Sequence, residues 1–307
     1  MRAIQQIGVL TLCMMASACY ADEVTDWLEK MGSALREQNY AGTYTYMRGS
    51  QFETIRVIHQ FADGREHERM LNLNGEPREV IRHDEEVICY HVNSSTPAFD
   101  HNVPLGPFSA TFNENLVNSQ ELYRFTLLGK DRIADRRVIR LQVIPRFNDR
   151  FGYRLWLDEA TGLLLQSQLV QRNRVLELFQ FSNITIGEPV ELAAVSTLGT
   201  DTVSHELSVK RVGGSAKPRL RVSWMPDGFK QVRVPQSNRL HFSDGLAALS
   251  IFIEHSNMSL PEMTTHRGGT TVITRTLKGA AGQVTVVGEV PISIARKVAE
   301  SVEPVIY

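Results

Sequence analysis

Residues 136–163 decide the fold of the first half of the chain, and they read RRVIRLQVIPRFNDRFGYRLWLDEATGL. Apolar and polar side chains alternate from Arg137 to Val143 and again from Tyr153 to Asp158. An alternation with a period of two is typical of a β-strand with one buried face. The stretch after Asp158 ends in Gly162, which can adopt a positive φ. These residues therefore predict consecutive antiparallel strands, two of them joined by a tight hairpin.

The same alternation continues on both sides of this stretch. Strand-like runs occupy residues 43–46, 54–61, 65–73, 78–83, 87–92, 123–128, 136–144, 152–158, 163–170 and 175–184. In the first half of the chain, helical spacing is clear only over residues 25–38, with a second, short helix expected near 114–120. A sheet with one apolar face needs a cover, and so little helix cannot supply it. We therefore expect an open, half β-barrel of antiparallel strands with a few covering helices.

Such a curled sheet can enclose a cavity. The apolar residues that alternate on two neighbouring strands are our candidates for lining a lipid cavity: Ile139, Leu141, Val143, Tyr153, Leu155 and Leu157. Arginine is abundant between Lys130 and Arg154, and guanidinium groups match the geometry of phosphate. The candidates for an anion site are Arg136, Arg140 and Arg154. The alternative is that these arginines form a solvated outer face of the sheet.

The chain divides into two domains and a connection. Residues 22–186 form the predicted open barrel, and residues 187–218, which end in GGSAKP, are expected to be a linker. Residues 219–307 predict a smaller α+β domain that closes with a helix over 293–302. We expect this domain to bind a protein partner through Phe242, Leu246, Phe252 and Ile253, although alternation assigns about half of such residues to the core.

The first 21 residues resemble a secretory signal peptide. One charge precedes an apolar run from Ile7 to Met15, and small residues follow up to Ala21. Cleavage after Ala21 is the first expectation, and acylation of Cys19 within a relaxed lipobox is the alternative. Either form of the mature chain is expected in the periplasm.

The composition excludes several classes of function. Lys+Arg number 33 and Asp+Glu 34, and 42% of the residues are hydrophobic, so the chain is a folded protein without the charge of a nucleic-acid binder. It contains none of the common nucleophile, phosphate-loop or dinucleotide motifs, and we expect no enzyme activity, cofactor or metal.

Two groups of residues leave alternatives open. Cys89 and His91 share one face of a predicted strand. They are a nucleophile and its base, or Cys89 forms an intermolecular disulfide, or it is a buried structural cysteine. The histidines on neighbouring predicted strands either converge on a metal or are scattered over solvated faces; they are His59, His67, His83 and His91.

Several segments together resemble a known family. In chain order they are DWL at 26–28, AGTY at 41–44, RFGY at 150–153, LDEATGL at 157–163, DGF at 227–229, FSDGLA at 242–247, SIFIE at 250–254 and VVGEVP at 286–291. Together with the N-terminal signal they resemble the RseB/MucB family of sigma-E regulators, over nearly the whole mature chain.

The resemblance implies both a fold and a function. It implies an N-terminal domain like the lipoprotein carriers LolA and LolB, and a small C-terminal domain. It further implies a negative regulator of the envelope stress response that binds the periplasmic part of an RseA/MucA-type anti-sigma factor, protects it from proteolysis, and is released by lipopolysaccharide or mislocalised lipoprotein. A periplasmic lipoprotein or lipid carrier is the alternative function, and a homodimer stays open.

Overall fold

The computed structural model of the 307-residue chain describes residues 23–84, 86–91, 120–188, 203–206, 220–232, 239–254, 261–277 and 282–304. An N-terminal helix spans residues 23–37. The strands of the first half are β1 (Tyr40–Arg48), β2 (Gln51–Ala62), β3 (Arg65–Asn72), β4 (Arg78–His83), β5 (Glu86–His91), β6 (Tyr123–Ile133), β7 (Arg136–Pro145), β8 (Gly152–Asp158), β9 (Leu164–Gln171), β10 (Arg174–Ile186) and β11 (Val203–Glu206).

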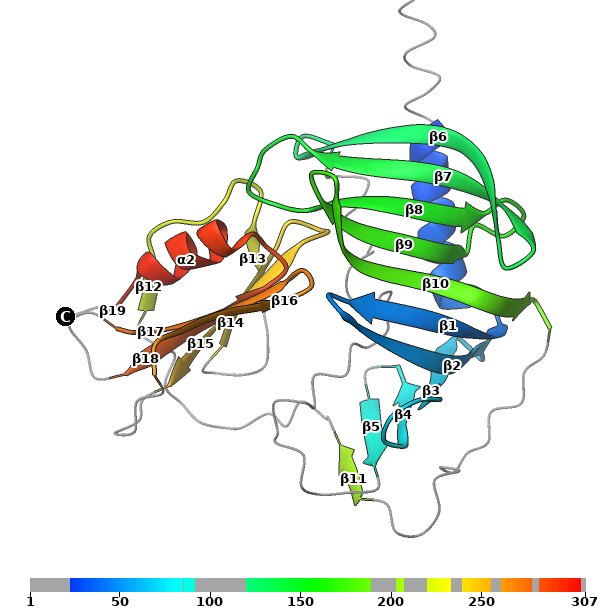
Figure 1. Ribbon diagram of the computed structural model, residues 1–307, viewed down its shortest axis with the longest axis horizontal. Helices are drawn as coiled ribbons and strands as arrows, with labels where there is room; N and C mark the ends of the chain where they lie inside the picture. The colour runs from blue at the N-terminus through cyan, green and yellow to red at the C-terminus, as the bar shows by residue number, and fades with distance from the viewer. Residues whose placement is uncertain are drawn as a thin grey trace, which may run out of the picture.

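These strands form one open, antiparallel sheet. Its order is β11-β5-β4-β3-β2-β1-β10-β9-β8-β7-β6, so β1 pairs with β10 in the middle. Within the described strands, no pair joins the edge strands β11 and β6 to close the sheet. Figure 1 shows the sheet curving around the N-terminal helix, which crosses one face behind β6 to β10. The predicted open barrel with little covering helix is confirmed.

The N-terminal helix packs its apolar stripe onto the concave face of the sheet. Leu28, Met31 and Ala34 are each at most 5% exposed and share one core cluster with residues of the strands. Lys30 also joins the helix to the β8–β9 turn, because its Nζ donates to the backbone oxygen of Glu159 at 3.1 Å. The helix therefore supplies the cover that an amphipathic sheet requires.

The second domain is a sheet with a helix on one face. Its elements are β12 (Leu220–Val222), β13 (Lys230–Val232), β14 (Arg239–Ser243), β15 (Ala248–Glu254), β16 (Met263–Arg267), β17 (Thr270–Thr276), β18 (Gln283–Gly288), α2 (Ile292–Glu300) and β19 (Val302–Pro304). The six-stranded order is β13-β14-β15-β18-β17-β16, and β12 pairs with β19 separately. Helix α2 buries Ala295, Val298 and Ala299 on this sheet, as its apolar stripe predicts.

The structure differs from the sequence-based expectation at the connection and in one hairpin. The range 187–218, expected to be a linker, contains β11, which pairs with β5 at the edge of the first sheet. One strand expected over 269–277 is the second arm of the hairpin β16–β17. The short helix expected near 114–120 lies almost wholly outside the described residues.

Candidate binding surfaces

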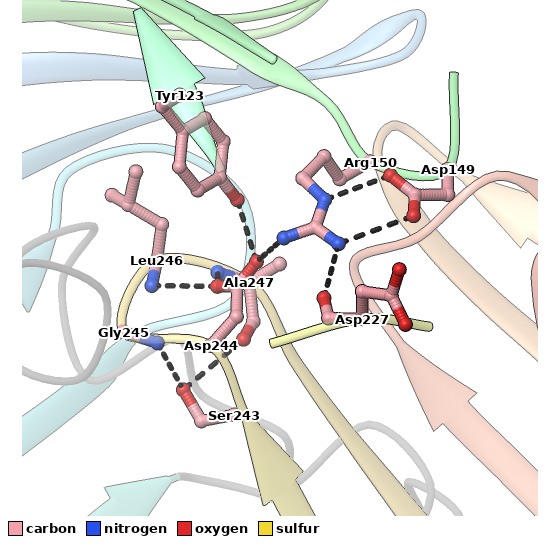
Figure 2. A network of polar contacts seen from close by, with 9 residues as sticks. All are labelled: Tyr123, Asp149, Arg150, Asp227, Ser243, Asp244, Gly245, Leu246 and Ala247. Carbon is pink, nitrogen blue, oxygen red and sulfur yellow. Dashed lines mark hydrogen bonds and ion pairs between the residues drawn. The ribbon is translucent and has the colours of Figure 1, made fainter. Parts of the chain in front are cut away.

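A buried polar network joins the two domains (Figure 2). Arg150, after β7, donates from Nη1 to Oδ2 of Asp244 at 2.5 Å and from Nη2 to the backbone oxygen of Asp227 at 2.6 Å. Tyr123 Oη donates to the same Asp244 oxygen at 2.9 Å. Asp149 flanks the guanidinium, with its Oδ1 accepting from Nε at 2.8 Å. The side chains of Arg150 and Asp244 are both 0% exposed, so this ion pair is sealed from water.

Asp244 also builds the turn that carries an apolar contact across the domain boundary. Its Oδ1 accepts from the backbone N–H of Leu246 at 2.9 Å and of Ala247 at 2.8 Å. Gly245 has φ 101°, which suits glycine in this turn. Leu246 is 2% exposed and belongs to the core cluster of the first domain. Asp244 therefore pairs with Arg150 of the first domain and also fixes the turn that places Leu246 of the second domain in the core of the first.

A second contact lies at the tip of the β16–β17 hairpin. The backbone N–H of Gly269 donates to Oε1 of Glu177 on β10 at 2.9 Å, and Tyr46 on β1 donates a short hydrogen bond to the other oxygen. Arg48 lies 3.6 Å from the same carboxylate. Side chains would not fit at the tip, because a Cβ on Gly269 would lie 2.1 Å from Leu169. The hairpin tip is therefore shaped to dock on the first sheet.

A carboxyl with an altered pKa lies beside this contact. Tyr153 Oη donates to Oε2 of Glu289 at 3.4 Å. Burial, and then the charge of Glu177, raises the pKa of Glu289 to about 7. Burial also raises the pKa of Tyr153 well above its usual value. The domain contact thus contains one group that titrates near neutral pH.

An open cleft of about 890 Å³ lies between the hairpin tip, the β1–β2 turn, the β9–β10 turn and the start of α2. Its basic lining residues come from both domains: Arg48 and Arg174 from the first, His266 and Arg267 from the second. The described lining includes no Asp or Glu. The cleft is thus a polar hollow of positive character at the domain boundary.

The sheet of the second domain packs one face against α2, and its other face carries Arg239 and Phe252. On the face away from α2, the guanidinium of Arg239 lies 5.4 Å from the ring of Phe252. Arg239 Nη2 and the hydroxyl of Ser250 are 2.9 Å apart, and burial lowers the pKa of both Arg239 and His241. Phe252 is half-buried, so part of its ring is available on this face.

The six candidate lipid-cavity residues all lie in the interior of the first domain. Leu141, Val143, Tyr153, Leu155 and Leu157 belong to the core cluster under the N-terminal helix, and Ile139 is 9% exposed. The leucines are 0% exposed, so no water-sized space adjoins them in this conformation. Binding of a lipid against them requires a rearrangement of this core, and their role in binding stays a prediction.

The three candidate anion-site arginines each have partners within the sheet. Arg136 Nε donates to Oδ2 of Asp158 at 2.6 Å, and this hydrogen bond raises the pKa of Arg136. Arg140 Nη2 donates to the backbone oxygen of Leu128 at 3.0 Å, and Arg154 Nη1 reaches Gln168 at 3.4 Å. The alternative of an outer sheet face with local pairing describes these arginines better than a shared anion site.

Of the four candidate partner-binding residues, three are buried. Phe242 is 9% exposed and lies in the core under α2, Ile253 is 3% exposed, and Leu246 inserts into the first domain. These three are unavailable to a partner in this conformation because they form cores and the domain contact. Only Phe252 keeps the position that the prediction requires.

The candidate catalytic and metal-binding residues lie in different environments and do not form one site within the described structure. Cys89 and His91 lie on β5, and their side chains are outside the described part of the structure. His59 is 1% exposed, stacks on Tyr40 and has its Nδ1 2.8 Å from the backbone oxygen of Gln38. The rings of His67 and His83 meet, with their Nδ1 atoms 2.6 Å apart. Within the described residues no group of three or more ligands could hold a metal ion.

Comparison with known proteins decides the family. The model of the MucB/RseB N-terminal domain matches residues 23–199, and that of the MucB/RseB C-terminal domain matches residues 214–303. The chain belongs to the MucB/RseB family. Among the described residues of this MucB/RseB protein, no helix has the length and apolar character needed to cross a bilayer.

Individual relatives agree over almost the full length. The sigma factor AlgU regulatory protein MucB of Pseudomonas aeruginosa is 31% identical, covering 99% of this chain and 98% of its own. The sigma-E factor regulatory protein RseB of Escherichia coli K12 is 25% identical, covering 90% and 89%. A solved complex of Pseudomonas aeruginosa MucA and MucB matches with a TM-score of 0.72 at 30% identity, covering 93% of this chain and 100% of that one.

Four of the eight segments that carry the family resemblance meet at the domain boundary. RFGY contributes Arg150 and Tyr153, DGF contributes the oxygen of Asp227, FSDGLA contributes Asp244, and VVGEVP contributes Glu289. No spacing pattern predicts that these segments meet, since Arg150 and Asp244 are 94 residues apart in the chain. In this MucB/RseB chain the signature segments build the junction between the domains.

Proposed function

We propose that this chain is a periplasmic negative regulator of a sigma-E-type envelope stress response. It binds the periplasmic domain of a membrane anti-sigma factor of the RseA/MucA type and protects that domain from regulated proteolysis. The observation that carries the proposal is the match of both domains to MucB/RseB models, together with the match to MucB solved in complex with MucA.

The experiment that tests this function follows the anti-sigma factor. The periplasmic domain of the anti-sigma factor from the same genome is incubated with a periplasmic protease that cleaves it, with and without residues 22–307 of this chain. The function predicts slower cleavage as the chain is added, up to saturation at one stable ratio. An unchanged cleavage rate at saturating chain would contradict it.

We place the partner surface on the face of the second sheet that carries Phe252. Its ring is half-buried beside Arg239, whereas the other expected contact residues are enclosed. A half-buried aromatic ring next to a guanidinium is typical of residues that dominate a protein interface.

Replacement of this ring gives the first mutational prediction. Phe252→Ala is expected to weaken binding of the anti-sigma domain about tenfold or more, because an interface aromatic contributes on the order of 2 kcal/mol. Phe52→Ala is the matched control, since Phe52 is 65% exposed on the first domain. Equal affinity of both variants, measured by calorimetric titration, would refute this placement of the surface.

Release of the partner needs a ligand that distinguishes the free protein from the complex. We propose lipopolysaccharide or mislocalised lipoprotein, with acyl chains entering under the N-terminal helix against the six apolar residues named above. Each buried CH₂ supplies about 0.8 kcal/mol, so a partly inserted chain could offset the cost of moving the helix. The lipid-carrier alternative has no specific observation in its favour, and the curated relatives that span this chain are sigma-factor regulators.

A further inference from the structure

The cleft at the domain boundary holds guanidinium groups that the rest of the described structure does not neutralise. Among the described residues, the side chains of Arg174, Arg267 and His266 are exposed and have no hydrogen-bond or ion-pair partner. This differs from Arg136, Arg140 and Arg154, which all have partners within their own sheet. Unpaired guanidinium groups that face one hollow, with no carboxylate in its described lining, favour an anionic ligand.

The geometry of the cleft adds donors that suit phosphate. The hydroxyl-bearing Ser50 and Ser293 and the amide-bearing Gln51 and Gln171 also line it. Helix α2 begins at Ile292 with no acidic residue in its first turn and no side-chain cap. Ile292 and Ser293 line the cleft, whereas the backbone N–H of Ile294 already donates to the carbonyl of Pro291. A phosphate has enough oxygens to accept from several of these donors at once.

We propose that this cleft is a binding site for a phosphate group carried by a sugar or a lipid headgroup. Arg174 from the first domain and Arg267 from the second bind the phosphate oxygens, and the start of α2 adds main-chain donors. The volume of about 890 Å³ accommodates a ligand larger than inorganic phosphate. Because the arginines come from different domains, the ligand favours the arrangement in which the domains are docked.

The site does not depend on the anti-sigma factor, and the test leaves that partner out. Residues 22–307 are titrated with three probes: inorganic phosphate, glucosamine 1-phosphate, and phosphatidylcholine vesicles with or without phosphatidic acid. Binding is measured by calorimetry for the soluble probes and by co-sedimentation for the vesicles. Failure in this test leaves the proposed function intact, whereas failure of the protease assay leaves this site intact.

The decisive comparison uses two double variants of equal charge change. R174Q/R267Q removes the two unpaired arginines of the cleft, and R56Q/R124Q removes two exposed arginines that are not among its lining residues. The loss of charge-assisted hydrogen bonds from both arginines is expected to lower the affinity for the probe by about tenfold or more. The control variant is expected to bind within about twofold of the unmodified chain.

The outcomes distinguish a phosphorylated sugar from a lipid headgroup, and they show whether the proposed site exists. Binding of glucosamine 1-phosphate that R174Q/R267Q weakens supports a soluble phosphorylated sugar, and selective binding to phosphatidic acid vesicles with the same sensitivity supports a lipid headgroup. Equal losses in both double variants would show a nonspecific charge effect and overturn the site. Absence of binding of every probe to the unmodified chain would overturn it as well.

Discussion

At the scale of single residues, the domain junction depends on buried polar groups that compensate one another's charge and hydrogen bonds. Arg150 and Asp244 are sealed from water, and each is satisfied by the other together with Tyr123 and the backbone. A buried ion pair contributes little net stability, but removal of one member leaves a charge without compensation. The junction is therefore sensitive to single substitutions that a solvent-exposed pair would tolerate.

Replacement of the arginine is the clearest residue-scale prediction. Arg150→Met is expected to lower the free energy of unfolding by about 3–5 kcal/mol, because Asp244 stays buried without its cation. Tyr123→Phe removes one hydrogen bond to the same carboxylate and is expected to cost about 1.5–3 kcal/mol. Urea denaturation of both variants checks the order, and an Arg150→Met protein as stable as the unmodified chain would contradict the role of the network.

Glu289 gives the junction a dependence on pH. Its pKa is about 7 in the folded protein against 4.5 for an unperturbed glutamate, so the folded state holds a proton that the unfolded chain releases. Stability from this group therefore rises as the pH falls from about 8 towards about 5, and the cost of the ionised form is fully present only above about pH 8.

Substitution of Glu289 tests that sign. Glu289→Gln is expected to stabilise the protein near pH 8 by on the order of 2 kcal/mol and to change little near pH 5, since the neutral amide replaces a protonated carboxyl. Glu300→Gln on the exposed side of α2 is the control. Urea midpoints at both pH values measure the effect. A larger gain in stability of Glu289→Gln at the lower pH would contradict a raised pKa of Glu289.

At the scale of elements, the N-terminal helix and the β8–β9 turn hold each other. Gly162 in the turn has φ 82°, and a Cβ there would lie 2.6 Å from Cγ and 3.1 Å from the backbone carbonyl carbon of Lys30. The glycine is therefore needed twice, for the turn conformation and for the close approach of the helix.

Alanine at this turn separates the two requirements. Gly162→Ala is expected to lower the free energy of unfolding by about 2–3 kcal/mol, because it combines backbone strain with contact against the helix. Gly64→Ala carries a similar strain at φ 74° with no atom within 4 Å of the added Cβ. The difference between the two, measured by thermal unfolding, reports the helix contact, and equal losses would show that the helix does not press on the turn.

The elements that could be predicted from sequence are those with one buried face. Strands 136–145 and 152–158 alternate apolar and polar residues, and the helix stripe with Leu28 and Met31 is equally regular. β16 could not be found this way, because all five of its residues, from Met263 to Arg267, are exposed and show no alternation. A pattern of burial can identify only elements that bury something.

The site was less predictable than the fold for a related reason. Arg136 was an expected anion ligand, but the register of the sheet brings it to Asp158, a partner that no spacing rule identifies. Leu246 is apolar like a partner-binding residue, yet it fills the other domain. The segments around Arg150 and Asp244 were recognisable as family signatures, while their meeting is a property of the tertiary structure.

At the scale of the whole molecule, two sheets are held as one unit by contacts that come from both. The Arg150–Asp244 network, Leu246 and the β16–β17 tip fix the junction, and the cleft lined by Arg174 and Arg267 lies beside it. If a ligand that bridges the cleft and a partner that binds the second sheet both favour the docked arrangement of the domains, each strengthens the binding of the other.

Direct titration tests whether this chain binds the periplasmic domain of an anti-sigma factor. Residues 22–307 are titrated calorimetrically with the purified periplasmic domain of the anti-sigma factor from the same genome. We expect a saturable complex with a Kd of about 1 µM or tighter, which corresponds to a free energy of binding near −8 kcal/mol. Titration without saturable heat and without co-elution at about 100 µM of each protein would contradict it.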